Sequence, residues 1–552
     1  MKKRCCLLTV LLLCLCLATS ALAAPDYMLL EGDGVTSPIV KDGENVAINV
    51  VISQGAKQGN ADQIWLWKYF EEVLNVKVNV EQVTDATEYR NLALASGDFP
   101  DIMINMGVSA SELVNYGQEE SMFLKIDEYI DEYMPHLKAI YEEHPEYRTA
   151  IEAPDGHIYA LGGIADPDDE TRNTGIHIHE KWLNELGLSM PETLDELVEA
   201  LRAMKAAYPD STPYSGSYNN SNPGLIILTA LGIVTSDAKG LSPALRKGEV
   251  IFPFGDRETY GEFLRILNTF YQEGIMSRDF FTMTSTQVYS MIAEGKGGLF
   301  SSAPWSASPD IYMDWNAAKP LTSAYNESPL WPANMGALTC GRWVINAETA
   351  YPELCCKLAD FFFSKTGLVL GFYGPMTMDT DILFDMTSGW YWDDASKWII
   401  YPDIVNDTAG IYGGMENMYR QAKIMLFTGV QMGDYRTFFE DVAEYAKADY
   451  RRVWSYDSLD FRHYAGMVDQ QKPYYTQGYP SNVFFDSETN ERVVELASVI
   501  KPFVEAETAK FVTGARPLTE EELDSYFTTL DAYGYQEYLQ YYADYYEANA
   551  AK

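Results

Sequence analysis

The stretch "ASGDFPDIMI", residues 95–104, decides how the first part of the chain folds. Gly97 is suited to end a helix, because glycine readily adopts the left-handed conformation that closes many helices. Pro100 prevents the helix from resuming, since proline lacks an amide hydrogen and its ring clashes with the preceding turn. The apolar run that follows therefore predicts a short buried strand over residues 101–105.

The segments before this stretch alternate between strand and helix patterns. Two have the alternation of strands and two the spacing of helices: "NVAINVVI" (45–52) and "VKVNVEQV" (76–83), then "ADQIWLWKYFEEVL" (61–74) and "DATEYRNLALAS" (85–96). The second helix opens with a capping pair, Asp85 and Glu88. Strand–helix–strand–helix–strand order predicts right-handed crossovers and a parallel sheet.

Polar residues follow two of these strands at the edge where ligands bind. In an open sheet of this kind, ligands lie beyond the carboxyl ends of the strands. The turn 53–55 follows the first strand, and the loop 105–109 follows the third. We therefore predict that four of these residues contact a ligand: Gln54, Gly55, Asn105 and Ser109.

A second sheet of the same kind is predicted further along the chain. "TQVYSMIAEGKGGLFSSAPW" (286–305) predicts a helix, a stop at Gly295, a strand over 298–301 and a loop that ends in Trp305. Capping pairs at Thr193 with Glu196, and at Thr519 with Glu522, mark the starts of two further helices. Two lobes would then each present a loop at the end of a strand.

The composition excludes two classes of partner. With 552 residues, 47% of them hydrophobic and 22% charged, the chain can form two or more globular domains. The net charge of -40 argues against nucleic acid and against an anionic membrane surface. Aromatic residues make up 13% of the chain, which fits either ordinary packing or flat faces for a sugar.

Residues 1–23 have the pattern of a secretory signal peptide. Lys2, Lys3 and Arg4 precede an apolar run, and Ala21-Leu22-Ala23 matches a cleavage site. We therefore expect an exported protein whose mature chain begins at Ala24. Leucines precede Cys14 and Cys16, which speaks against a lipid anchor but leaves anchoring open.

Motifs for catalysis and metal binding are missing. The sequence has no zinc-protease helix, no phosphate-binding lysine loop, no nucleophile elbow and no pair of cysteines spaced for zinc. We predict that His177 and His179 lie at the surface of one strand, and that Cys355 and Cys356 lie in a buried helix. The role of Cys340 stays open. We expect no metal and no cofactor.

Several stretches, in their order and spacing, resemble one family. They run from about residue 46 to the C-terminus and include "LASGDFPDIMI", "DGHIYAL", "EKWLNELGLSMPETLDELVEALRAMKA", "FYQEGIMSRDF", "IAEGKGGLF" and "NAETAYPELCCKLADFFFSKTG". In these the chain resembles the bacterial extracellular solute-binding proteins of ABC transporters, family 1, of carbohydrate-binding type, in its large lipoprotein-like branch.

The resemblance implies an α/β fold of the periplasmic-binding-protein type II. Each of two lobes would be a mainly parallel sheet flanked by helices, joined by a hinge. After the signal peptide and a flexible lead (24–44), it implies these parts: 45–165 and 336–400 in the first lobe, 166–335 and 401–552 in the second. It also implies no catalysis. A monomer would capture an oligosaccharide and hand it to permease subunits.

The resemblance transfers few single residues. Relatives that bind maltodextrins place a sugar-stacking tryptophan within "GPW", and Trp305 in "SAPW" matches it. Where relatives carry charged sugar contacts after "PDI", this chain has Asn105, Val108 and Ser109. Tyr159 and Tyr214 complete the set of ligand-contact candidates. The calcium loop of alginate-binding relatives is not transferred, because "YPDSTPYSGS" (208–217) lacks its acidic residues.

Other functions remain open from the sequence. A secreted glycan-active enzyme would share the export signal, the acidity and the aromatic content. A binding protein for peptide or another polar solute, or a sensor subunit, would need the same cleft. The sequence identifies neither the solute nor the permease.

Overall fold

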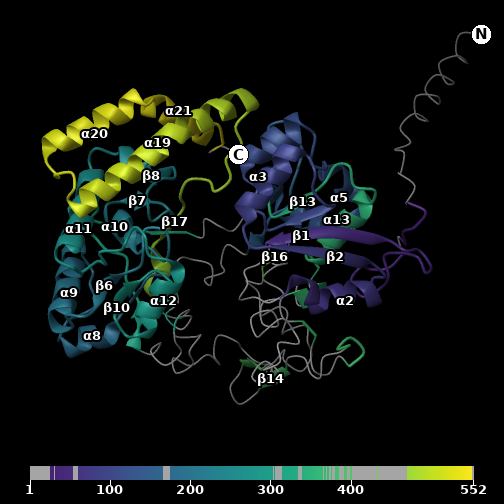
Figure 1. Ribbon diagram of the computed structural model, residues 1–552, viewed down its shortest axis with the longest axis horizontal. Coiled ribbons are helices and arrows are strands. Elements are labelled where there is room, and N and C mark those ends of the chain that lie inside the picture. Colours follow the sequence, from purple (N-terminus) through teal and green to yellow (C-terminus); the bar gives the residue numbers. More distant parts are fainter. Residues whose placement is uncertain are drawn as a thin grey trace, which may run out of the picture.

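The protein folds into two lobes that lie side by side (Figure 1). The computed structural model describes residues 25–29, 31–53, 60–165, 175–302, 304, 307, 314–333, 339–364, 366–367, 370–371, 374–375, 380–384, 391–393, 398–400, 430–431 and 469–549. Each lobe is built on its own sheet with helices packed around it, which confirms the predicted two-lobed α/β fold.

The first lobe contains the parallel sheet predicted from residues 45–105. Its strand order is β13-β3-β1-β2, with β1 (Ala47–Ser53), β2 (Lys77–Val83), β3 (Ile102–Ile104) and β13 (Trp343–Ile345). β1 pairs parallel with β2 and β3, and β13 joins antiparallel to β3. Val50 and Ile52 pack in one apolar cluster and Val51 in another, so the sheet is covered on both faces.

Several helices pack around this sheet, and α3 (Ala86–Ser96) begins and ends where the local signals predict. These helices are α2 (Trp65–Glu72), α3 (Ala86–Ser96), α5 (Asp127–Tyr133), α6 (Pro135–Glu143), α7 (Pro145–Thr149) and α13 (Pro352–Phe361). The Asp85 carboxylate caps α3 by accepting from the Glu88 amide at 2.9 Å, and Gly97 ends it at a φ of 73°. Cys355 and Cys356 are fully buried on α13, as predicted.

The second lobe is built on a mixed sheet with the order β11-β5-β10-β6. Its strands are β5 (His177–Ile178), β6 (Thr212–Ser215), β10 (Gly297–Phe300) and β11 (Asn316–Ala317). β10 pairs parallel with β6 and antiparallel with β5. A smaller antiparallel sheet comprises β7 (Ile233–Val234), β8 (Ala244–Arg246) and β9 (Glu249–Ile251).

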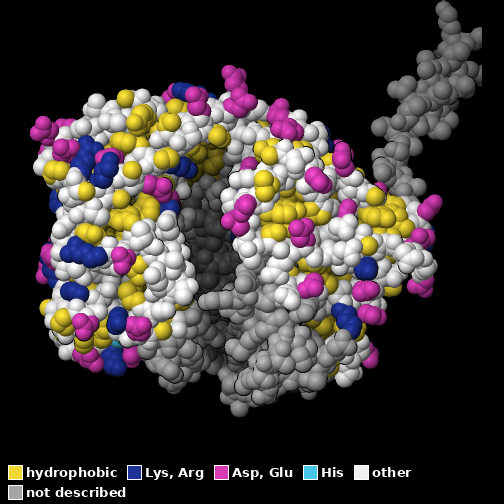
Figure 2. All heavy atoms as spheres, viewed as in Figure 1, with side chains coloured by type: hydrophobic (Ala, Val, Ile, Leu, Met, Phe, Trp, Pro, Cys, Tyr) yellow, Lys and Arg dark blue, Asp and Glu magenta, His cyan; other side chains and the backbone are white. Residues whose placement is uncertain are grey.

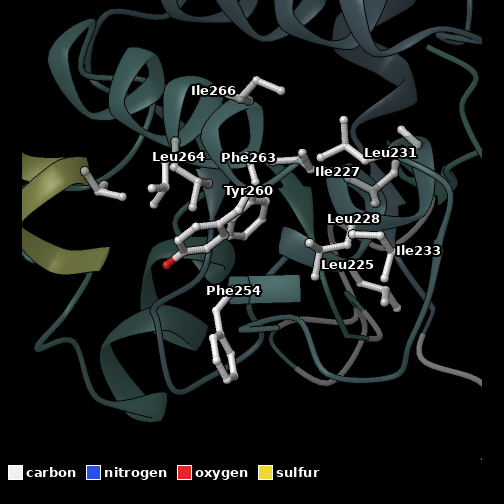
Figure 3. Close-up of a cluster of buried hydrophobic side chains, with 14 of the residues drawn as sticks. Leu225, Ile227, Leu228, Leu231, Ile233, Phe254, Tyr260, Phe263, Leu264 and Ile266 are labelled. Atoms are coloured by element: carbon white, nitrogen blue, oxygen red, sulfur yellow. The ribbon is translucent and has the colours of Figure 1, made fainter. Parts of the chain in front are cut away.

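Five helices surround the second sheet. They are α8 (Glu180–Glu185), α9 (Leu194–Ala207), α10 (Gly224–Ala230), α11 (Tyr260–Gln272) and α12 (Ser285–Ala293). Thr193 and Glu196 form the predicted capping box of α9. Figure 3 shows the side chains of α10 facing those of α11 and Phe254 in one buried cluster. This cluster is the core of the lobe.

Three C-terminal helices complete the second lobe and lie along its upper side in Figure 1. They are α19 (Ser487–Thr513), α20 (Glu520–Ala532) and α21 (Tyr535–Asn549). Thr519 caps α20, as predicted. The Thr508 hydroxyl of α19 meets the Tyr260 hydroxyl of α11 at 2.6 Å inside the core. The helices thus pack onto residues almost 250 positions earlier in the sequence.

Ile164 packs in the core of the first lobe and Ile176 in the core of the second, and the crossing between lobes near residue 165 stays a prediction. There β4 (Ile164–Ala165) pairs with β16 (Val430–Gln431). Of the predicted second-lobe segment 401–552, residues 401–429 and 432–468 lie outside the described residues, as do the predicted signal peptide and cleavage site. The exact domain boundaries therefore stay predictions. Within the part of the chain that the structure describes, no helix combines the length and apolar character needed to span a membrane.

The prediction that His177 and His179 lie at the surface was wrong. His177 is 1% exposed and His179 is 4% exposed, so neither lies at the surface. Both faces of this strand are buried, since Ile176 and Ile178 are also fully enclosed. Burial lowers the pKa of both imidazoles to about 4, because the charged form loses its water.

Candidate functional site

The loop after β3 is held rigidly at the edge of the first sheet. Asn105 has a φ of 57°, a left-handed conformation that asparagine tolerates better than most residues, and its amide donates to the Arg342 carbonyl at 2.7 Å. The Arg90 guanidinium donates to the carbonyls of Met106 and Gly107 at 2.9 and 2.7 Å. The loop therefore delivers Ser109 to a fixed position.

Ser109 begins a short helix that faces the second lobe. It caps α4 (Ala110–Glu112) in a capping box with Glu112, and Glu112 pairs with Arg90 at 2.9 Å. The chain continues directly into a π-helix, Leu113–Glu119. Helices of this rare type occur often at functional sites.

The other predicted ligand contacts are divided between the lobe interiors and undescribed loops. Tyr159 is 1% exposed in the first lobe, where its hydroxyl donates to the Asp155 carboxylate at 2.6 Å. Tyr214 is fully buried in the second, where its hydroxyl donates to the Asn222 side-chain oxygen at 3.1 Å. Gln54, Gly55 and Trp305 lie outside the described residues. The ligand contacts predicted for these five residues stay predictions.

A cavity of about 510 Å³ lies where the two lobes meet the C-terminal helices. Figure 2 shows the surface hollowed between the lobes. The first lobe contributes residues 109–111. The second contributes Thr235, Ser236, Ser242 and Pro243. The remaining wall comes from residues 479–485 and from α19 and α21. Of the predicted contacts, Ser109 lines this cavity, whereas Asn105, Tyr159 and Tyr214 are not among its described lining residues.

One face of α19 forms the longest wall of this interlobe cavity. Asn490, Val493, Ala497 and Lys501 are three or four residues apart and so lie along one side of the helix. At a rise of 1.5 Å per residue, this face is about 16 Å long. The wall is therefore long enough to contact an extended ligand at several points.

Aromatic rings and hydroxyl groups give the cavity two kinds of contact. Tyr479, Phe485, Tyr538 and Tyr542 line one side, and the Tyr479 hydroxyl donates to the Tyr542 carbonyl at 2.8 Å. Serine and threonine side chains line it as well: Ser109, Ser111, Thr235, Ser236, Ser242 and Ser481. This combination suits a ligand with apolar faces and polar edges.

The first turn of α19 and the residues before it connect both lobes beside the cavity. Phe484 packs in the core of the first lobe, and its neighbour Phe485 packs in the core of the second. Asn490, which is 2% exposed, donates its side-chain amide to the Asn115 side-chain oxygen at 2.9 Å and to the Ser111 carbonyl at 3.3 Å. Movement of one lobe against the other must therefore act on this segment.

Metal binding has no support in the part of the chain that the structure describes. No group of three or more histidine, cysteine, aspartate or glutamate side chains there could hold an ion. The acidic stretch "DPDDET" (166–171) lies outside the described residues.

Comparison with known proteins identifies the family. Residues 53–368, more than half of the chain, match the profile of the bacterial extracellular solute-binding proteins. The chain belongs to this family. Family members bind solutes rather than transform them, so this solute-binding protein is a receptor and not an enzyme.

Two curated relatives of this solute-binding protein are both 26% identical to it. The fructooligosaccharide ABC transporter substrate-binding protein FusA of Streptococcus pneumoniae aligns over 97% of this chain and 96% of its own. The polygalacturonan/rhamnogalacturonan-binding protein YtcQ of Bacillus subtilis aligns over 42% of this chain and 45% of its own.

Solved structures show the same fold. FusA in complex with kestose matches 92% of this solute-binding protein and 99% of its own chain, with a TM-score of 0.69 and 21% identity. An HMO-binding ABC-transporter-associated solute-binding protein from Bifidobacterium longum infantis gives the same coverage, with a TM-score of 0.67 and 20% identity.

Proposed function

We propose that this protein captures an oligosaccharide in the cleft between its lobes and delivers it to the permease subunits of an ABC importer. The observation that carries the proposal is the relationship to the fructooligosaccharide-binding protein FusA, which extends over nearly the whole of both chains. A relationship of that extent includes both lobes and the C-terminal helices, and hence every wall of the interlobe cavity.

The chemistry of the cavity supports a carbohydrate ligand. A sugar ring has an apolar face, which tyrosine rings can cover, and hydroxyl edges, which serine and asparagine side chains can satisfy. Tyr542 and Phe485 supply such faces, and Ser109 and Ser111 supply polar groups. A binding site between two lobes also allows closure to remove water from the ligand.

We also propose that the protein is exported and acts as a monomer. The signal-peptide pattern at residues 1–23 supports export, and the family is extracellular. The receptor would act as a monomer on the outer side of the membrane, where the closed, loaded form is what the permease recognises. Neither a cofactor nor a metal is needed for this cycle.

Calorimetric titration of the mature protein with a panel of oligosaccharides tests the proposal. The panel contains kestose, longer fructans, xylo-oligosaccharides and galacturonides, with a peptide mixture as the comparison. We expect one-to-one binding of a sugar, a rise in melting temperature and no cleavage product by chromatography. Peptide binding without sugar binding would contradict the oligosaccharide assignment, and product formation would contradict a receptor.

A further inference from the structure

The charge of the interlobe cavity differs from that of the rest of the protein. The sequence has 80 acidic and 40 basic residues, so a surface chosen at random is acidic. Among the described residues that line the cavity there is no aspartate or glutamate, and the one charged side chain is Lys501 of α19. The lining therefore has a local charge opposite to the net charge of the molecule.

Lys501 lacks a partner within the described part of the structure. Its ammonium group forms no hydrogen bond or ion pair there. Asp237 and Glu505 act on it by their charge, but both are bound to other groups. The Asp237 carboxylate accepts from the amides of Lys239 and Leu241 and from the Ser242 hydroxyl at 2.9 Å each, and Glu505 pairs with the Lys239 ammonium at 3.5 Å.

Burial makes this isolation costly. Lys501 is half-buried on the face of α19 that lines the cavity, and desolvation lowers its pKa below the ordinary value of 10.5. A partly desolvated cation is stabilised by an anion that binds beside it. An anionic group on a ligand in the cavity is therefore the chemical complement of Lys501.

We propose that the interlobe cavity takes an oligosaccharide bearing one carboxylate, a uronate, and that Lys501 pairs with this group. The inference rests on the proposed function and narrows its ligand class. One lysine balances one negative charge, which matches a carboxylate, whereas a phosphate ester carries close to two charges at neutral pH. The hydroxyls of Ser236 and Ser242, which line the same cavity, would bind the neutral part of the sugar near Lys501.

Pairs of ligands that differ only in the charge of the carboxylate test its role in binding. The probes are aldobiouronate and aldotriouronate, in which one glucuronate is joined to one or two neutral xyloses, each with its methyl ester. The ester removes the charge and keeps the ring. We expect an acid to bind the wild-type protein about tenfold to a hundredfold more tightly than its ester, the range for a charged hydrogen bond in a partly buried site.

Variants of α19 assign the effect to one residue. Lys501→Gln should abolish the preference for the acid, so that the ratio of acid affinity to ester affinity falls to about one. Lys501→Arg, which keeps the charge, should retain part of the preference. Lys510→Gln is the control, because Lys510 is an exposed lysine on the same helix, paired with Glu507 at 2.7 Å and absent from the described lining of the cavity.

The outcomes separate this inference from the proposed function. If kestose or another neutral sugar binds and the acids bind no better than their esters, the inference is overturned and the oligosaccharide function stands. If Lys501→Gln binds the acid as tightly as the wild type, Lys501 is not the partner and the inference is overturned as well. If no carbohydrate of either kind binds, both proposals fail.

Discussion

Replacing Asn490 by alanine should loosen the attachment between the lobes. The Asn490 side-chain amide belongs to α19, which packs in the second lobe, but it donates to Ser111 and Asn115 of the first. The side chain is 2% exposed, so water cannot readily replace these two bonds. The substitution leaves two acceptors without their donor at the junction of the lobes.

The size of the effect follows from these two hydrogen bonds. Removing a donor from buried acceptors costs about 1 to 3 kcal/mol. At about 1.4 kcal/mol per factor of ten, the observed arrangement of the lobes should lose about 5-fold to 150-fold in population relative to more open ones. A change of this size is measurable if the open form is populated at all in the wild type.

Thr508→Val is the matched control for this experiment. Thr508 lies on the same helix, is 3% exposed, and bonds the Val504 carbonyl at 2.7 Å and the Tyr260 hydroxyl at 2.6 Å. All of these groups belong to the second lobe. The control should therefore lose a similar free energy of unfolding without any change in the distance between the lobes.

Electron–electron double resonance between two spin labels measures that distance. Cysteines at Leu92 on α3 and at Leu188 after α8 are suitable, because these side chains are 65% and 36% exposed and lie on different lobes. Cys340, which is half-buried, is changed to alanine in all proteins. Asn490→Ala should shift the distribution to longer distances, and Thr508→Val should not. An unchanged distribution in Asn490→Ala, with the stability loss of the control, would refute the interlobe role.

Three further predictions concern the site, the pH response and metal. Trp305→Ala should weaken sugar binding about tenfold to a hundredfold at little cost in stability, whereas a loss of roughly 3 to 5 kcal/mol on unfolding would mean that Trp305 is a core residue. Because His177 has a pKa of about 4 when folded and about 6.5 when unfolded, acid favours the unfolded state between these values. Protonation of His177 should lower the free energy of unfolding by up to about 3 kcal/mol as the pH drops from about 6.5 to 4. When that free energy is measured by urea unfolding at several pH values, it should depend less steeply on pH in His177→Asn than in the wild type. An equal dependence on pH would contradict the lowered pKa of His177. A chelator should leave the melting temperature unchanged, and a decrease that calcium reverses would contradict that expectation.

The sequence predicted a helix well where its two ends depend on interactions between neighbouring residues. Asp85 and Gly97 define α3 through one side-chain hydrogen bond and one left-handed residue, and neither depends on distant parts of the chain. The exposure of His177 and His179 depends on what covers the strand. A period of two places both on one face, but both faces of β5 are buried, and no local pattern distinguishes that case from a half-exposed strand.

The residues of the candidate site also differ in whether local sequence signals or distant packing determine their positions. The position of Ser109 at the sheet edge could be predicted because a parallel sheet fixes where its loops end; Ser109 lines the cavity, and its contact with a ligand stays a prediction. Asn490 and Lys501 were missed because they reach the site through the packing of α19 on α11, between segments more than 200 residues apart. The sequence gives one local indication of their role. Asn490 and Lys501 are polar residues on the same face of a long helix as the apolar residues Val493 and Ala497.

A crystal structure of the mature protein with a bound oligosaccharide tests the central claim most directly. The account predicts sugar between the lobes, in contact with Ser109 or Ser111 of the first lobe and with the α19 face of the second. Sugar bound only on the outer surface of one lobe, with the interlobe cavity unchanged, would contradict it.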